Sequence, residues 1–238
     1  MRIDVYPVYT EVAERDLRER TLVMMDVLRA GPAITAAVQS GAEKVIPMRE
    51  VSEAIALSRT LERADTVLAG ERDGLALAGF DTGSSPLWFT PERAAGKTVV
   101  MTTANGTAAL TSARITDRVL VGSLVNRTAV AEAIVQLGQN AAIICAGTDG
   151  RFSADDIYGA GAVLSAVRQR TGALSSNDVG VLAELFYEAD RAAHRFLMET
   201  ENLRRLLELG CGADVEYCFR EDSTLIVPVY FDGYIGAR

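Results

Sequence analysis

Acidic and guanidinium side chains gather in this sequence directly after short apolar runs, where an α/β enzyme holds its substrate. The members of this group are Asp26, Arg29, Glu71, Arg72, Asp149 and Arg151. Carboxylate oxygens favour a hard cation such as Mg²⁺, and the planar guanidinium fork binds phosphate, carboxylate or sulfonate. The combination predicts a metal-assisted phosphoryl site, with Asp26, Glu71 and Asp149 as candidate catalytic residues and as the candidates for metal ligands.

Each of these side chains also has an ordinary interpretation. A loop acid is commonly a solvated charge or a helix-terminus charge, and an arginine is commonly a surface ion-pair partner. Ligands of open parallel sheets bind outside the carboxyl ends of the strands, so convergence of several such loops favours a site. The role of each acid taken alone stays open.

Small and polar residues would complete the substrate site. Asn105, Gly106 and Thr107 lie where a strand is expected to turn into a helix, so backbone amides and a hydroxyl would face an anion. A turn that only connects the two elements is the alternative. The predicted substrate-binding residues are Arg29, Arg72, Asn105, Gly106, Thr107, Thr148, Gly150 and Arg151.

Cys145 and Arg151 have the Cys-x5-Arg spacing of thiol phosphatases, in which a thiolate attacks phosphorus and an arginine binds phosphate. Cys145 also ends an apolar run, which favours a place in the core. The nucleophile stays open between water, a carboxylate and Cys145. The only histidine, His194, lies in an expected helix, where packing or solvation is favoured, and a zinc site built from several histidines is excluded.

The composition is that of a globular protein that acts on small molecules. Of 238 residues, 49% are hydrophobic, enough for one large core, so we expect a single domain over residues 1–238. A net charge of −8 disfavours nucleic acid as a partner. No apolar run approaches the roughly 20 residues of a membrane span, and three cysteines indicate no disulfide framework. We expect a cytoplasmic protein that does not bind membranes, and homo-oligomer formation stays open.

Apolar β-branched runs alternate with helical stretches, which is typical of parallel strands joined by crossover helices. This order predicts a three-layer α/β/α fold with a mostly parallel, mixed sheet. The expected strands are Arg2–Tyr6, Leu22–Met25, Lys44–Met48, Thr66–Ala69, Thr98–Thr102, Arg118–Val121 and Ala142–Cys145. Helices are expected to begin at Ala33, Val51, Asn105, Thr128 and Ser153, the last with a capping box of Ser153 and Asp156.

The C-terminal third is expected to hold one long helical region, Asn177–Leu209, followed by two extended runs, Val215–Phe219 and Thr224–Tyr230. These runs would add an antiparallel piece to the sheet, with Pro228 at an edge or a bulge. The segment Glu71–Phe89 has no clear periodicity, and a long loop in a compact domain is usually functional.

Several blocks in fixed order resemble the 2-phosphosulfolactate phosphatase family. They are MDVLRAG, GERDGLALAGFDTGSSP, TTANGTAAL, VGSLVNRTAVAEA, CAGTDGRFSADDIYGAG and IVPVYFDG, and they cover nearly the whole chain. The resemblance implies a magnesium-dependent hydrolase that releases phosphate from 2-phospho-3-sulfolactate, giving sulfolactate for coenzyme M biosynthesis or other sulfonate metabolism.

The resemblance also implies a set of active-site residues. They are Asp26, Arg29, Glu71, Arg72, Asp81, Asn105, Gly106, Thr107 and Thr148 to Arg151. The chain departs from the family pattern at Gly31-Pro32-Ala33, in place of a more hydroxyl-rich stretch, and at Ala108. A phosphotransferase or isomerase acting on a phosphorylated hydroxy acid, and a non-catalytic binder of sulfonate or phosphate anions, are the competing functions.

Overall fold

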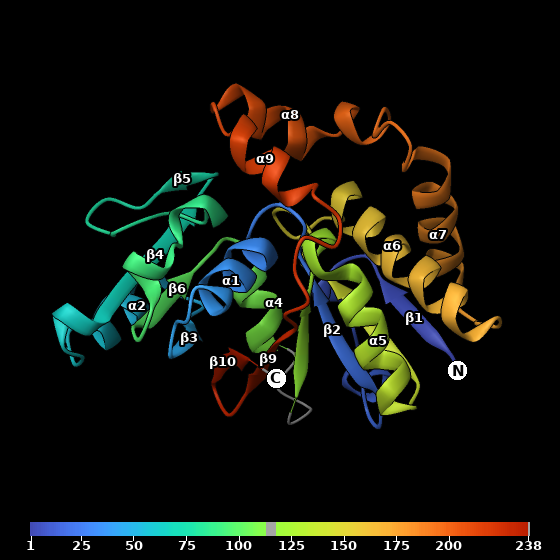
Figure 1. Ribbon diagram of the computed structural model, residues 1–238, viewed down its shortest axis with the longest axis horizontal. Coiled ribbons are helices and arrows are strands. Elements are labelled where there is room, and N and C mark those ends of the chain that lie inside the picture. The colour runs from blue at the N-terminus through green and yellow to red at the C-terminus, as the bar shows by residue number, and fades with distance from the viewer. Residues whose placement is uncertain (113–117, 238) are drawn as a thin grey trace.

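One mixed sheet runs through the computed structural model, which describes residues 1–112 and 118–237. Its strands, in spatial order, are β1 (Ile3–Tyr6), β8 (Ala141–Cys145), β2 (Thr21–Met25), β7 (Val119–Gly122), β9 (Pro228–Phe231), β10 (Tyr234–Ala237), β3 (Lys44–Pro47), β6 (Thr98–Thr102), β4 (Thr66–Arg72) and β5 (Leu75–Ala76). Helices pack on its faces (Figure 1). The predicted three-layer α/β fold with a mixed sheet is confirmed.

The sheet consists of two parallel groups joined by an antiparallel hairpin. Strands β1, β8, β2 and β7 form one group, and β3, β6 and β4 form the other. Between them, β9 pairs antiparallel with β7, and β10 pairs antiparallel with both β9 and β3. Adjacent strands rotate by roughly 20 to 25° per step, so the three steps from β7 to β3 turn the two groups strongly relative to each other.

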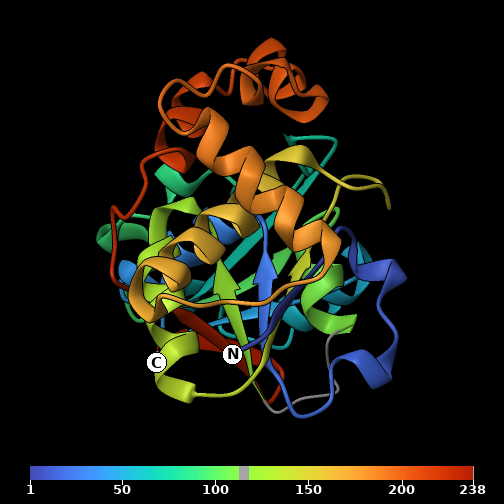
Figure 2. The ribbon, with the colours of Figure 1, turned by 90° about the vertical axis from the view of Figure 1, so that its right-hand side faces the viewer.

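Alternation along β2 explains the two apolar layers. Val23 and Met25 face the cluster formed with α5 (Arg127–Leu137), α6 (Ala154–Thr171) and α7 (Asp178–Asp190). Leu22 and Met24 face the opposite cluster, which contains α1 (Ala30–Gln39) and α4 (Gly106–Ser112). Because successive side chains of a strand point to opposite faces, a fully apolar strand requires helices on both sides. Figure 2 shows α7 packed outside α6.

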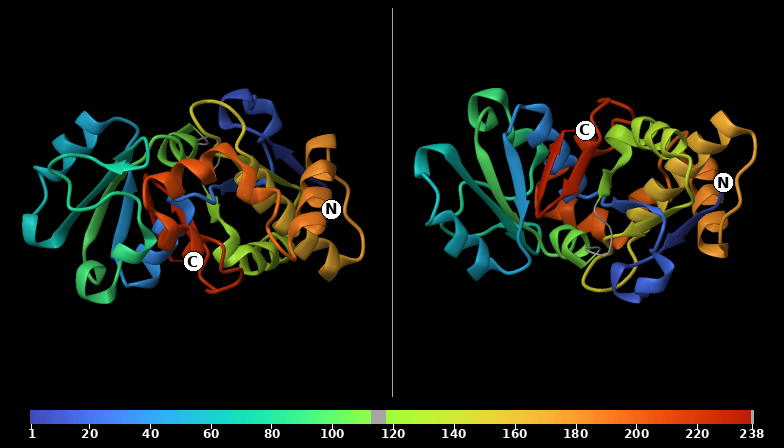
Figure 3. Two further views of the ribbon diagram at one scale, coloured as in Figure 1. Left: turned by 90° about the horizontal axis from the view of Figure 1, so that it is seen from above. Right: turned by 90° about the horizontal axis from the view of Figure 1, so that it is seen from below.

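The remaining α-helices of the described residues are short. They are α2 (Val51–Ser58), α3 (Pro91–Ala94), α8 (Glu201–Glu208) and α9 (Gly212–Cys218). Seen from above, α8 and α9 lie over the region between the two strand groups (Figure 3). Among the described residues, none of the helices has the length and apolar character needed to cross a membrane.

The predicted strands from the N-terminus to Cys145 are confirmed within a few residues at each end, and so are the starts of the predicted helices. The main difference is that β4 continues to Arg72, so Glu71 and Arg72 belong to the strand rather than to the loop after it. The capping box at Ser153 is wrong. The hydroxyl of Ser153 donates to Asp155, and Asp156 accepts backbone hydrogen bonds from other loops.

The C-terminal third differs most from the prediction. The helical region Asn177–Leu209 is divided, because the buried Asp190 carboxylate accepts from the amides of Phe196 and Leu197 and ends α7. His194 therefore lies after α7 with φ of 51°, not within a helix, and packs against aromatic rings as expected.

The two expected extended runs have different outcomes. The prediction of an extended run at Val215–Phe219 is wrong, because this segment forms α9, where Val215 and Cys218 are buried at helical spacing. Thr224–Tyr230 is extended in the sheet only from Pro228, as the expected antiparallel addition. Strand β9 lies inside the sheet, so the edge position is also wrong. Pro228 is tolerated as the first residue of its strand.

The hairpin β9–β10 should hold the two strand groups together. Ile235 is fully buried and pairs with Val45 at the single registered position between β10 and β3. Ile235→Ala should lower the free energy of unfolding by about 2 to 5 kcal/mol, from lost burial plus the cavity left behind.

Chemical denaturation followed by far-UV and near-UV circular dichroism measures this loss. Tyr234→Ala, at the exposed neighbouring position, is the control and should cost less than about 1 kcal/mol. Coincident transitions would support the expected single domain, whereas two separate transitions would contradict it.

Candidate active site

A pocket opens where the loops after β2, β4, β6 and β8 meet beneath α8. Its lining residues are Asp26, Leu28, Arg29, Ala30, Glu71, Asp73, Gly74, Ser84, Thr103, Ala104, Asn105, Gly106, Thr148, Asp149, Asn202, Arg205 and Leu206. The predicted convergence of four loops is therefore what the structure shows. The three candidate acids Asp26, Glu71 and Asp149 all line this pocket.

The pocket is narrow, with a volume of about 40 Å³. That volume corresponds to about three water molecules. A wider groove of about 950 Å³ shares Thr148, Asp149, Asn202 and Arg205 with the pocket and continues past Phe152. A ligand larger than a cation and a few oxygens would therefore extend from the pocket into the groove.

Asp26 is buried directly after β2. Its Oδ1 accepts from the amide of Ala30 at 2.9 Å, at the start of α1. Burial raises the pKa of Asp26 to about 7, and the neighbouring charges of Asp155 and Glu71 add to the rise against the lowering by backbone amides. The site therefore holds more potential negative charge than its own donors balance.

Two glycines allow the backbone to close around Asp26. A Cβ on Gly106 would lie 2.6 Å from Asp26 Oδ2 and 2.6 Å from the Cβ of Ala30. A Cβ on Gly31 would lie 2.2 Å from the backbone oxygen of Asp26. The glycine of the Asn-Gly-Thr turn is thus required by close packing of α4 against the acid. The departure from the family pattern at Gly31 likewise coincides with a position that has no room for a side chain.

Glu71 links the end of β4 to the loop that follows β6. Its Oε1 accepts from the amide of Ala104 at 2.8 Å, and its Oε2 accepts from the amide of Gly74 at 2.9 Å. Each carboxylate oxygen keeps a further lone pair, so these contacts leave room for a cation. The first part of the segment Glu71–Phe89 therefore contributes to the pocket through Glu71, Asp73 and Gly74.

Asp155 and Asp156 are the acids that sequence reasoning missed as part of the site. Both are buried, and burial raises both pKa values; the charge of Asp155, and then that of Asp26, further raises the pKa of Asp156. Asp156 Oδ1 accepts from the amide of Val27 at 2.9 Å, and Oδ2 accepts from Gly147 at 2.8 Å. It thereby ties the loop after β2 to the loop after β8. The two adjacent acids in the sequence are the available signal, but the sequence pattern assigns Asp156 to a capping box and gives Asp155 no role.

The segment Thr148–Arg151 forms a tight turn at the mouth of the pocket. Thr148 and Arg151 exchange two backbone hydrogen bonds, and Asp149 and Gly150 both have positive φ, 52° and 72°. An Asp-Gly pair suits this turn because both central residues need the left-handed region. The amide of Asp149 donates to Asn105 Oδ1 at 3.1 Å, which links this turn to the Asn-Gly-Thr turn. Gly150 and Arg151 line the groove, not the pocket.

Arg29 lines the pocket but also braces it. Its Nη1 donates to Asp214 at 2.6 Å, and its Nη2 donates to the backbone oxygen of Gly74 at 2.7 Å. The Arg29 and Asp214 side chains are only 6% and 9% exposed. Removal of one member of a buried pair is costly, so this contact fastens α9 to the pocket. The substrate-binding role predicted for Arg29 remains a prediction beside this bracing role.

Three other predicted residues lie outside the pocket lining. Arg72 donates to the backbone oxygens of Glu71 and Arg49 and to the hydroxyl of Thr102. Thr107 is fully buried and exchanges hydrogen bonds with Thr103.

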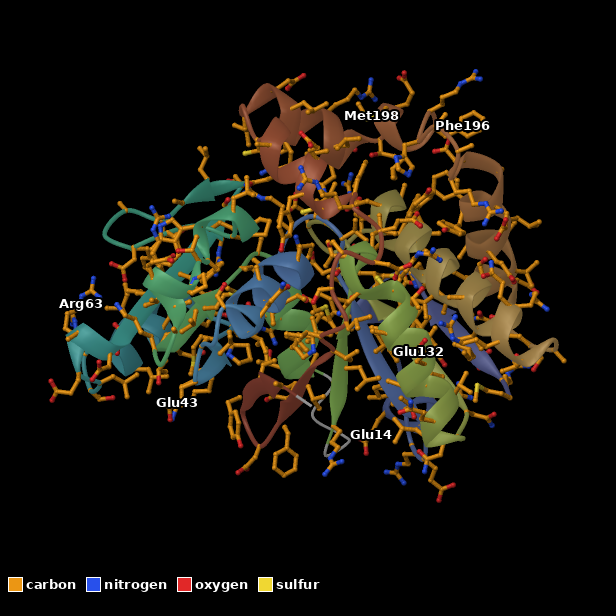
Figure 4. All side chains as sticks on the ribbon, viewed as in Figure 1. Glu14, Glu43, Arg63, Glu132, Phe196 and Met198 are labelled. Carbon is orange, nitrogen blue, oxygen red and sulfur yellow. The ribbon has the colours of Figure 1, made fainter. Side chains whose placement is uncertain are left out.

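Asp81 is the third of these residues. It pairs with Arg63, which lies at the far end of the β4 group, away from α8 (Figure 4). These contacts give Arg72 and Thr107 supporting positions around the strand ends, whereas Asp81 lies beside the first half of β4. None of the three lines the pocket.

Cys145 lies in the core beneath the site. It is fully buried among apolar side chains, and burial, with the charges of Asp156 and Asp155, raises the pKa of its thiol well above the ordinary value. A thiolate nucleophile needs a lowered pKa and access to the ligand. The geometry therefore favours water or a carboxylate over Cys145.

The donor set fits a magnesium ion held by few protein ligands. Within residues 1–112 and 118–237, no three acid, histidine or cysteine side chains form a ready ligand cluster. Mg²⁺ is commonly bound by one or two carboxylates, with water and substrate oxygens completing the shell. Asp26 and Glu71 match that pattern, whereas Asp149 is 67% exposed at the pocket mouth.

Comparisons with known proteins identify the family. The family model described as 2-phosphosulpholactate phosphatase matches residues 6–233. This chain belongs to the 2-phosphosulfolactate phosphatase family. The resemblance seen in the sequence blocks is thus confirmed, and the family is one of phosphoric monoester hydrolases.

Similar proteins named "Probable 2-phosphosulfolactate phosphatase" include the following three. The protein of Caldanaerobacter subterraneus subsp. tengcongensis is 39% identical over 99% of this chain and 98% of its own length. Those of Clostridium acetobutylicum and Clostridium tetani are 36% and 34% identical, each over 99% of this chain and 100% of its own length.

Asp156 should stabilise the two loops that it connects beneath the pocket. Asp156→Ala leaves two buried amides without acceptors and should lower the free energy of unfolding by about 2 to 6 kcal/mol, at about 1 to 3 kcal/mol for each amide. Urea denaturation measures the loss. Asp178→Ala, at an exposed acid in the first turn of α7, is the matched control and should cost less than about 1 kcal/mol. Equal losses in the two variants would contradict the bridging role.

Proposed function

We propose that this protein hydrolyses 2-phospho-3-sulfolactate to 3-sulfolactate and phosphate with the help of Mg²⁺. The observation that carries the proposal is the pair of buried carboxylates, Asp26 and Glu71, in one pocket at the strand ends of a chain of this family. The product would enter sulfonate metabolism such as coenzyme M biosynthesis. We also propose a cytoplasmic location.

Asp26 and Glu71 would hold the cation. A bound Mg²⁺ supplies positive charge that neutralises phosphate oxygens as the ester bond breaks. The protein holds both carboxylates in place through backbone amides, from Ala30 to Asp26 and from Ala104 and Gly74 to Glu71. Two carboxylates that are positioned before the substrate arrives need no reorganisation during the reaction.

Other residues of the pocket would orient the substrate. The linked turns bring Asn105 to the pocket and Thr148 to the junction of pocket and groove, where an amide and a hydroxyl could bind an anion. The buried carboxylates would repel an anion that arrived without a cation, which favours a metal-assisted enzyme over a metal-free anion binder.

Phosphate release from 2-phospho-3-sulfolactate tests the proposal directly. We expect release by the purified protein, loss of release in excess chelator, and recovery with Mg²⁺ in preference to Zn²⁺. Asp26→Asn should lower kcat by at least about a hundredfold, because an amide lacks the charge that holds the cation.

Asp65→Asn, at an exposed acid, is the control and should match the wild type. Circular dichroism checks that both variants fold. Full activity in chelator would rule out the metal, and near-native turnover of Asp26→Asn would leave that residue a structural role only.

Metal binding should depend on pH through Asp26. Since the pKa of this carboxyl is about 7, Mg²⁺ must displace a proton below that pH. Affinity measured by calorimetry should fall about 16-fold from pH 7 to about pH 5.5, because half of the Asp26 carboxyl is already protonated at pH 7. Asp26→Asn should bind Mg²⁺ weakly at both pH values, without this dependence.

The folding stability of the metal-free protein should also depend on pH through Asp26. A raised carboxyl pKa means that the unfolded chain loses the proton more readily than the folded chain. The Asp26 contribution to stability is therefore present below about pH 4 and is lost as pH rises through about 7. A pH-independent affinity for Mg²⁺ would contradict this assignment.

A further inference from the structure

Helix α8 brings two polar side chains to the pocket that the sequence blocks did not single out. Asn202 and Arg205 are one turn apart, and both line the pocket and the adjoining groove. The side-chain Nδ2 of Asn202 donates to Asp155 Oδ2 at 3.3 Å, which ties α8 to the buried acids. Arg205 therefore lies at the junction where a ligand would pass from the narrow pocket into the groove.

The position of α8 is set by its apolar face. Leu203 and Leu206 are buried with Val215 of α9 in a small cluster that also contacts Leu28, next to the brace residue Arg29. Residues three and four apart lie on one helix face, so burial of Leu203 and Leu206 fixes the direction in which the neighbouring polar face points. Helix α8 thus presents Arg205 on a supported scaffold.

Arg205 differs from Arg29 in how firmly its protein partners hold it. Its Nη2 donates to Asp73 Oδ1 at 3.0 Å, and its Nη1 lies 4.0 Å from Asp149 Oδ2. The Arg205 side chain is 34% exposed, and that of Asp73 is 83% exposed. Exposed ion pairs contribute little net free energy, so a ligand anion can replace these carboxylates at small cost.

We propose that Arg205 binds the sulfonate of the substrate and thereby sets its specificity, an inference that rests on the proposed function. The reacting phosphate belongs beside Asp26 and Glu71 in the narrow pocket, which leaves the groove side for another anionic group. The carboxylate of the substrate is a good ligand for a hard cation and can remain near the metal. The weakly basic sulfonate is a poor ligand for such a cation, and it suits the weakly hydrated guanidinium fork.

Asp73 would then act as a competitor for the same guanidinium. It occupies Arg205 in the ligand-free protein and must release it when the sulfonate binds. Asp73→Asn should therefore lower KM for 2-phospho-3-sulfolactate severalfold. This gain should vanish in the double variant with Arg205→Gln, because the effect acts through that arginine.

Kinetics with two substrates test the assignment. Arg205→Gln should raise KM for 2-phospho-3-sulfolactate at least about 30-fold and change kcat less than threefold, since a charged hydrogen-bond pair is lost only in binding. KM for 2-phospholactate, which lacks the sulfonate, should change less than threefold. Arg205→Lys should recover part of the loss. Arg204→Gln, at the exposed neighbouring arginine of α8, is the matched control and should behave as wild type.

Direct binding separates this inference from the proposed function. Calorimetry with 3-sulfolactate in the presence of Mg²⁺ should show the same 30-fold weakening in Arg205→Gln, with lactate as the sulfonate-free comparison. If the wild type releases no phosphate but loses 3-sulfolactate affinity in Arg205→Gln, the sulfonate site stands and the hydrolase proposal fails. Equal losses on both substrates, or an unchanged KM and affinity in a folded Arg205→Gln, would overturn the sulfonate site.

Discussion

The concentration of buried carboxylates at one end of the sheet is the constraint on which the rest of the structure depends. Burial raises the pKa values of Asp26, Asp155 and Asp156, and the charge of Asp155 adds to the rise at the other two. Backbone amides donate hydrogen bonds to Asp26 and Asp156. Burying charge without a partner is costly, so the loops must wrap closely around these acids. The close approach at Gly31 and Gly106 is the geometric result. A bound cation would offset the repulsion between these carboxylates, so the same residues that destabilise the empty fold could form a metal site.

The arrangement of the sheet determines which loops can meet around those acids. Through the hairpin β9–β10, the pairing pattern makes β3, β6 and β4 run opposite to β7. In a flat sheet, the ends of the two groups would therefore lie at opposite edges. The six steps from β2 to β4 accumulate roughly 120 to 150° of twist, which turns the carboxyl ends of both groups toward one pocket. Helices α8 and α9 cover this region (Figures 1 and 3).

The arginines around the pocket divide by burial into two kinds. Arg29 is buried and donates hydrogen bonds to Asp214 and to the backbone oxygen of Gly74, so it stabilises the walls of the site. Arg205 is partly exposed and pairs with exposed carboxylates, so its donors can pass to a ligand. The two residues have the same side chain, so the difference in burial and in hydrogen-bond partners gives one a structural role and leaves the other available for a ligand.

The sequence alone determined the family, the alternation of strands and helices as far as Cys145, and the acids Asp26 and Glu71 at the strand ends. These features follow from local periodicity and from residues directly next to apolar runs. Tertiary structure alone decided that Val215 belongs to a helix, that β9 lies inside the sheet, and that Arg205 rather than Arg72 reaches the pocket. Such outcomes depend on packing between segments far apart in the chain, which short-range patterns do not specify.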